Sequence, residues 1–197
     1  SASALQERDI ASSVQHRIMT LAYAFVMTED MEYARRAERD MLTISTLDGW
    51  AQADCDLIAE YTAALSLGYD WLYHSLPVHS RSIIGTAIYE KSLQKVDGIS
   101  FEGENAMVAV GMMYGALATL ERAPEFCRAM AERCAAAMPS LLERYADDGA
   151  FKADVVNWQR NTEATVLLLA ALESAVGSDL GAASNKGFML TPTLMTH

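Results

Sequence analysis

Residues 105–120 read NAMVAVGMMYGALATL, and this uncharged run decides the fold class. A segment that is apolar on every side is typical of a helix buried in a protein core, and this one is too short to span a bilayer comfortably. Residues 164–172, ATVLLLAAL, have the same character. We therefore predict two inner helices that are covered on all sides.

Apolar residues recur at helical spacing through the rest of the chain, and no stretch shows the period of two that is typical of strands. Helices are predicted over about 10–25, 30–44, 53–74, 77–97, 104–120, 124–145 and 156–176. The second, fourth and sixth carry charged residues opposite an apolar stripe, which is typical of outer helices. The fold class predicted is all-α: a partial or complete α/α toroid of antiparallel helical hairpins, with inner and outer helices and no significant sheet. We expect one domain over residues 1–188 and a C-terminal tail over 189–197.

Composition limits the function classes. The chain has 197 residues, 51% of them hydrophobic, and a formal net charge of −11. This charge argues against broad binding to nucleic acid or to an anionic membrane. The start of the chain lacks the pattern of a signal peptide. The cysteines (Cys55, Cys127 and Cys134) are expected to be reduced, and neither a metal nor a cofactor is predicted.

Four segments in order carry a family resemblance: GYDWLYHSLPVHSRSIIGTAIYEK from residue 68, ENAMVAVGMMYGALATL from 104, LLERYADDGAF from 141 and TEATVLLLAALESAVGSDLG from 162. Together they resemble the helical toroid domain of heparinase II/III-like polysaccharide lyases. The resemblance implies β-elimination on a uronate-containing acidic polysaccharide and a periplasmic or secreted location. In that family a β-sandwich region follows the toroid and completes the active cleft. Since this chain ends shortly after residue 188, we expect an excised or truncated relative.

The resemblance assigns one catalytic role directly. Asn105 matches the family's asparagine that neutralises the uronate carboxylate, and the start of a buried helix also favours an anion. The alternative is that Asn105 is only a helix N-cap. Where the family has its tyrosine after the Asp-Gly turn, this sequence has Asn157 or Trp158. A complete lyase site within this chain is therefore not expected.

Other residues are candidates for substrate binding. Trp158 and Arg160 suit a glycan cleft as a stacking ring and a carboxylate partner, or else a packing ring and a surface cation. Tyr69 and Trp71 flank Asp70, for which we expect burial and a structural tie more than a ligand contact.

Two clusters of charged or polar residues are not interpreted as binding sites. The cluster Arg35, Arg36 and Arg39 is interleaved with acids and is interpreted as a solvated face. His74 and His79 have no carboxylate at matching spacing, so no metal site is predicted there.

Two function classes stay open. The chain is either the toroid part of a lyase that acts on acidic polysaccharide or oligosaccharide, or a non-catalytic scaffold or glycan- or protein-binding module derived from that fold. Neither class implies nucleic acid or a membrane as partner. An apolar helix left uncovered at the open side of a partial toroid also predicts a possible homodimer.

Overall fold

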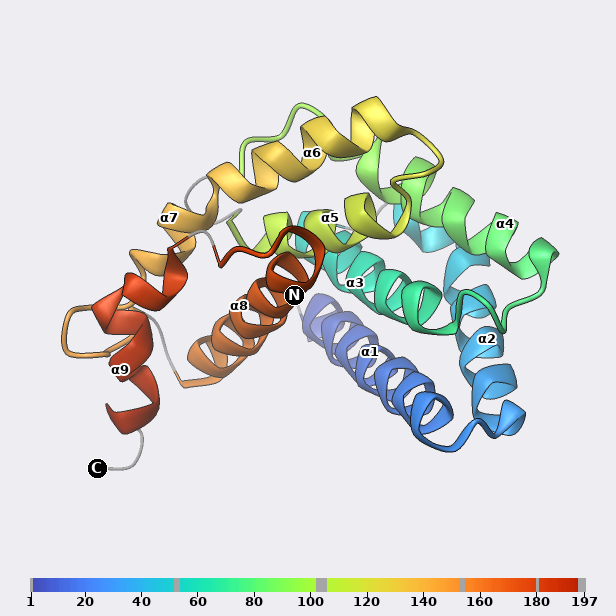
Figure 1. Ribbon diagram of the computed structural model, residues 1–197, viewed down its shortest axis with the longest axis horizontal. Helices are drawn as coiled ribbons and strands as arrows, with labels where there is room; N and C mark the ends of the chain where they lie inside the picture. The colour runs from blue at the N-terminus through green and yellow to red at the C-terminus, as the bar shows by residue number, and fades with distance from the viewer. Residues whose placement is uncertain (1, 52–53, 102–105, 153–154, 180, 195–197) are drawn as a thin grey trace.

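The computed structural model describes residues 2–51, 54–101, 106–152, 155–179 and 181–194 (Figure 1). The described residues are almost entirely helical, as predicted, and their one β feature is an isolated bridge between Tyr145 and Phe151. The helices are α1 (Ala2–Thr28), α2 (Met31–Thr46), η1 (Asp48–Ala51), α3 (Cys55–Leu72), α4 (Val78–Thr86), η2 (Ala87–Leu93), α5 (Ala106–Ala118), α6 (Pro124–Ala136), α7 (Met138–Leu142), α8 (Val155–Val176), η4 (Ala182–Ser184) and α9 (Lys186–Leu194).

The helices alternate between two positions along the chain. α1 packs on α3, α3 on α5, and α5 on α8, so these four follow one another along one side of the molecule (Figure 1). α2 packs on α1 and α3, η2 on α3 and α5, and α6 on α5. The result is a row of four helices backed by the intervening ones, as expected for hairpins that wrap into two layers.

The α3–α5 contact is the centre of the core. The described side chains of α5 from Val108 to Ala116 are all buried, which confirms the prediction of a covered helix for that part of the run. The two backbones approach closely at Gly111, where an added Cβ would lie 2.4 Å from the carbonyl oxygen of Ala59. A residue without a side chain is therefore needed at this crossing.

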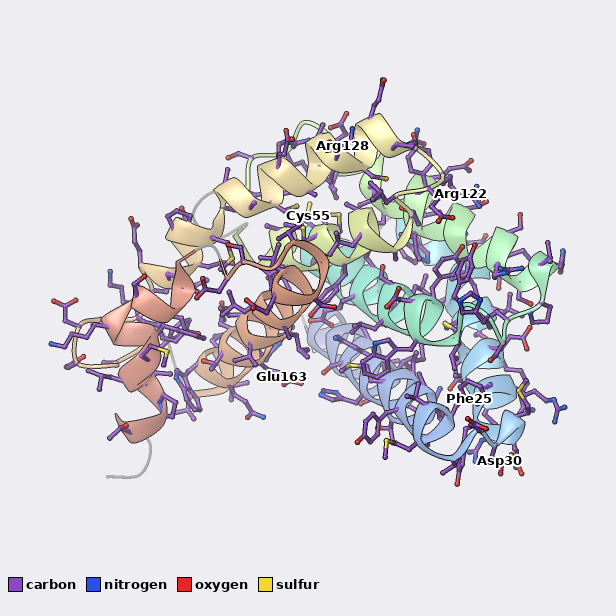
Figure 2. The ribbon with its side chains drawn as sticks, in the orientation of Figure 1. Phe25, Asp30, Cys55, Arg122, Arg128 and Glu163 are labelled. Carbon is purple, nitrogen blue, oxygen red and sulfur yellow. The ribbon has the colours of Figure 1, made fainter. Side chains whose placement is uncertain are left out.

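Caps define the α1–α2–α3 connections. Asp30, in the turn labelled in Figure 2, accepts a hydrogen bond from the backbone N–H of Glu32 at 2.9 Å, and Asp54 does the same for Leu57 at 2.9 Å. Carboxylates at N-caps satisfy backbone donors that the first turn leaves unpaired.

The helix predicted over 77–97 is wrong in one respect. It begins as α4 after the N-cap Pro77 but continues as the π-helix η2, whose wider turn hydrophobic periodicity does not reveal. Lys91 lies in η2 and donates to the carbonyl oxygens of Ser45 at 2.8 Å and Leu47 at 3.2 Å. A cation thus stabilises the C-terminal end of α2.

Three further predictions need correction. The described part of the segment predicted as a tail, residues 189–194, is helical, because α9 runs through Leu194, and Thr191 donates to the Gly149 carbonyl oxygen at 2.6 Å. The helix predicted over 124–145 is interrupted between α6 and α7, next to Pro139. The apolar run in α8 is not covered on every side, because Val166 is 50% exposed.

Candidate functional site

A cleft of about 340 Å³ lies where α1, α3, α5 and α8 converge. Its floor is formed by small residues of the crossing helices, Ala59, Ala63 and Gly111, which leave space beside the backbone. Its walls carry polar groups from α1, α8 and the segment after α7. An apolar floor with convergent polar groups is typical of a small-molecule or sugar site.

Arg144 supplies a cation to this cleft. Its Nη1 donates to Oδ1 of Asn161 at 3.2 Å, and its guanidinium lies over the Phe151 ring at 5.2 Å from the centroid. The Asn161 side chain is itself fixed, because its Nδ2 donates to the Asn157 carbonyl oxygen at 2.6 Å. Within the described ranges, no carboxylate lies within 4.0 Å of the Arg144 guanidinium, so a ligand carboxylate can pair with it.

Tyr114 of α5 lines the same cleft with only 6% of its surface exposed. Burial raises the pKa of its phenol well above the ordinary value, because the phenolate would lose its hydration. Tyr114 therefore keeps its proton at neutral pH. It can donate a hydrogen bond, but the raised pKa makes it a weak acid, and in its protonated form it does not act as a base.

Two polar ties cross the cleft and hold α8. Arg160 of α8 pairs with Glu60 of α3 through Nη2 and Oε1, with 45% and 14% of the side chains exposed. Nε2 of His16 in α1 lies 3.1 Å from Oε1 of Glu163 in α8. Glu163 is labelled in Figure 2.

Both ring nitrogens of His16 are engaged. Nε2 faces the Glu163 carboxylate, while Nδ1 lies 2.8 Å from the Ser12 carbonyl oxygen. Since both partners accept, both contacts are hydrogen bonds when the ring carries two protons.

The structure brings together two of the predicted site residues. Asn157 and Arg160 both line the cleft. Trp158 does not: its Nε1 donates to Oγ1 of Thr191 in α9 at 2.8 Å, so it is the packing ring of the alternative interpretation. Asn105 lies outside the described residues.

Tyr69 and Trp71 lie at the other end of α3, away from the cleft. Tyr69 is half-buried beside Tyr73, with ring centroids 5.4 Å apart, and Trp71 lies near Tyr23 of α1 at 6.5 Å. Burial raises the pKa of the Tyr69 phenol. The expected burial of Asp70 is wrong, because Asp70 is exposed near the end of the helix, where its carboxylate stays hydrated.

Sequence reasoning missed Arg144, Tyr114, and the tie between His16 and Glu163. Tyr114 offered a signal, since a phenol within an otherwise apolar helix requires a polar partner or water for its hydroxyl group. Nothing local predicted the tie, because His16 and Glu163 meet only through the packing of α8 beside α1.

Two kinds of feature are absent from the described residues, a metal-binding cluster and a membrane-spanning helix. No group of three or more His, Cys, Asp or Glu side chains is arranged to hold a metal ion. None of the helices in that part of the chain is long and apolar enough to cross a membrane.

Compared with known proteins, the sequence matches no protein-family model and no curated protein at a significant level. The family resemblance, the lyase activity and the homodimer therefore stay predictions.

Proposed function

We propose that the chain is the toroid part of a heparinase II/III-like polysaccharide lyase and that the cleft binds a uronate residue of an acidic polysaccharide. The observation that carries this proposal is the Arg144 guanidinium, which lies in the cleft with an amide partner and with no carboxylate within 4.0 Å among the described residues. The row α1, α3, α5 and α8 supports it, because these are the helices that would be the inner ones of a toroid.

The proposed chemistry is β-elimination. The C–H bond next to the uronate carboxylate breaks, its electron pair forms a double bond, and the bond to the glycosidic oxygen on the neighbouring carbon breaks. Arg144 would neutralise the charge that develops on the carboxylate, and Tyr114 would donate a hydrogen bond to the leaving oxygen. The proton taken from the carbon would pass from the base to that oxygen.

A base is the missing part of this proposal. Tyr114 retains its proton, and both nitrogens of His16 are engaged by Ser12 and Glu163. We assign the base to a region outside the cleft, as the family resemblance implies for a histidine of the β-sandwich region. This chain by itself is therefore expected to bind uronate without turning it over.

The second candidate is a non-catalytic scaffold or binding module, and the charges of the cleft favour it. Asp56, Glu60 and Glu163 bring three carboxylates to the cleft against the two guanidinium groups of Arg144 and Arg160. Arg160 is already paired with Glu60. A neutral glycan or a protein segment would meet less repulsion there than a polyanion.

The test is calorimetric titration with uronate oligosaccharides of the alginate, hyaluronan and heparan types. We expect saturable binding of at least one type, weakened about ten-fold or more, roughly 1.4 kcal/mol, in Arg144→Gln. Arg128→Gln is the matched control, because Arg128 is exposed on α6, away from the cleft, and loses the same charge.

Three outcomes separate the candidates. Binding that Arg144→Gln abolishes and Arg128→Gln preserves supports the uronate site. Ultraviolet absorbance from an unsaturated uronate product would show that this chain contains its own base. Absence of binding to all three types, with both variants folded, contradicts the proposal and leaves the scaffold.

A further inference from the structure

A second hollow, of about 280 Å³, lies between α1 and α2. We call it the arginine groove; its lining residues are Arg17, Leu21, Arg36, Arg39 and Asp40. It lies on a different side of α1 from the cleft, since His16 points to α8 whereas Arg17 points to α2. The groove therefore stands apart from the proposed uronate site.

One guanidinium of the groove is already oriented. Nε of Arg17 donates to Oδ2 of Asp40 at 2.7 Å, an ion pair that joins α1 to α2. This contact uses one of the five N–H donors of the guanidinium and restricts the side chain. The terminal donors of Arg17 are left for another acceptor, at a reduced entropic cost of ordering the side chain.

Arg36 and Arg39 add two cations that have no carboxylate partner among the residues that the structure describes. Their spacing of three places both on one face of α2, and no described carboxylate lies within 4.0 Å of either. By contrast, Arg160 and Arg133 elsewhere in the chain each pair with an acid.

The sequence interpretation of this region as a solvated face is confirmed for its exposure, because Arg35, Arg36 and Arg39 are all exposed. Of the acids next to these arginines in sequence, Asp40 lies in the groove, whereas Glu38 accepts a hydrogen bond from Ser80 of α4. Within the groove, three guanidinium groups meet one carboxylate, and that carboxylate is bound to Arg17. The local charge is positive in a chain whose net charge is −11.

We infer that the arginine groove binds a tetrahedral oxyanion group, a phosphate or a sulfate carried as a monoester on a small molecule or sugar. Guanidinium groups on two facing helices can donate to several oxygens of one such group, which a single surface arginine cannot do. The hollow has room for the oxyanion and part of its carrier. Asp40, the acid in the groove, does not compete with the oxyanion for the terminal donors of Arg17, because it binds the Nε edge of that side chain.

The experiment is calorimetric titration of the full chain with glucose 6-phosphate and glucose 6-sulfate, at one ionic strength set with sodium chloride and at about pH 7.5, where a phosphate monoester is mostly dianionic. We expect saturable binding of at least one ester. The double variant Arg36→Gln/Arg39→Gln should weaken it by about ten-fold or more, because two charge-assisted contacts are lost.

A second double variant, Arg35→Gln/Arg128→Gln, is the matched control. It changes the net charge equally but alters exposed arginines that do not line the groove. A loss of less than about two-fold is expected from it, since only long-range attraction changes. Circular dichroism checks that both variants keep the helicity of the unaltered chain.

The ester that binds more tightly identifies the oxyanion, and equal binding leaves the shared chemistry supported. Absence of saturable binding to both esters overturns the inference. Equal weakening in the two double variants also overturns it, because the groove would then contribute nothing beyond net charge.

Discussion

The helices α3 and α8 are both apolar on average but differ in how they are held. Leu65 and Leu72 of α3 are fully buried, and α3 is packed between α1 and α5. α8 packs mainly on α5, exposes Val166, and reaches α1 and α3 through the His16–Glu163 and Arg160–Glu60 contacts. The rigid part of the molecule is thus apolar, whereas one wall of the cleft depends on polar ties in contact with solvent.

The largest expected effect comes from truncating equal side chains in these two helices. Leu65→Ala in α3 should lower the free energy of unfolding by about 2–5 kcal/mol, because it leaves a cavity in a fully buried region. Leu169→Ala in α8 should lower it by roughly 1 kcal/mol or less, since Leu169 is only half-buried. Urea denaturation measures both, and equal losses would mean that α8 is packed as tightly as α3.

The second prediction compares two contacts of α3: the contact with α5 at Gly111, and the contact with α1 and α2 at Gly68. Gly111→Ala places a Cβ against the backbone of Ala59, which cannot move aside, and should destabilise the protein by about 1–3 kcal/mol. Gly68→Ala is the control, because its Cβ would meet side-chain atoms of Ile18 and Met41 and no backbone atom is among its nearest neighbours. The loss at Gly68 should be smaller than the loss at Gly111. The better helix propensity of alanine, about 1 kcal/mol, offsets part of the loss at both positions. A larger loss at Gly68 would contradict the close backbone crossing.

The sequence was sufficient for the features that local rules determine. The helical class, the buried run of α5 and the cap at Asp30 follow from periodicity, hydrophobicity and capping chemistry. The burial of α8 could not be predicted in the same way. Hydrophobicity gives the tendency of a helix to be covered, but the number of neighbouring helices determines whether it is.

The candidate site was predictable only in part. Asn157 was named because it aligns with the family's tyrosine position, and Arg160 because it is a cation near the start of a helix; both line the cleft. Arg144 and Tyr114 come from a different helix and a different turn, and only packing brings them to the same cleft. Contacts between residues distant in sequence leave no mark in local composition, which is also why the arginine groove was not predicted.

The third prediction uses pH to compare the interior with the cleft. Burial raises the pKa of the Cys134 thiol on α6 from 9.0 to about 12. Between these values the unfolded chain releases a proton that the folded chain keeps, so stability falls as the pH rises. The contribution of this thiol approaches about 1.4 kcal/mol per pH unit. Under reducing conditions, Cys134→Ala should therefore make the alkaline decline in unfolding free energy shallower by this amount.

Cys55→Ala is the control for this measurement, because Cys55 is only half-buried at the start of α3. It should leave the slope of unfolding free energy against pH close to that of the unaltered chain. An unchanged slope in Cys134→Ala would show that water reaches the α5–α6 interface, which would remove the distinction between a dry interior and a solvated cleft wall.

The smallest expected effect concerns the tie between Arg160 and Glu60. Because nearly half of the Arg160 side chain is exposed, solvent screens the pair, and its coupling energy should be about 0.2–1 kcal/mol. A double-mutant cycle with Arg160→Gln and Glu60→Gln, measured by urea denaturation in low and high salt, isolates this energy. The coupling should decrease as salt is added. A salt-independent coupling of several kcal/mol would mean that the cleft wall is held as firmly as the apolar core. The helices α3 and α8 would then differ in the kind of contacts that hold them, and not in the stability of those contacts.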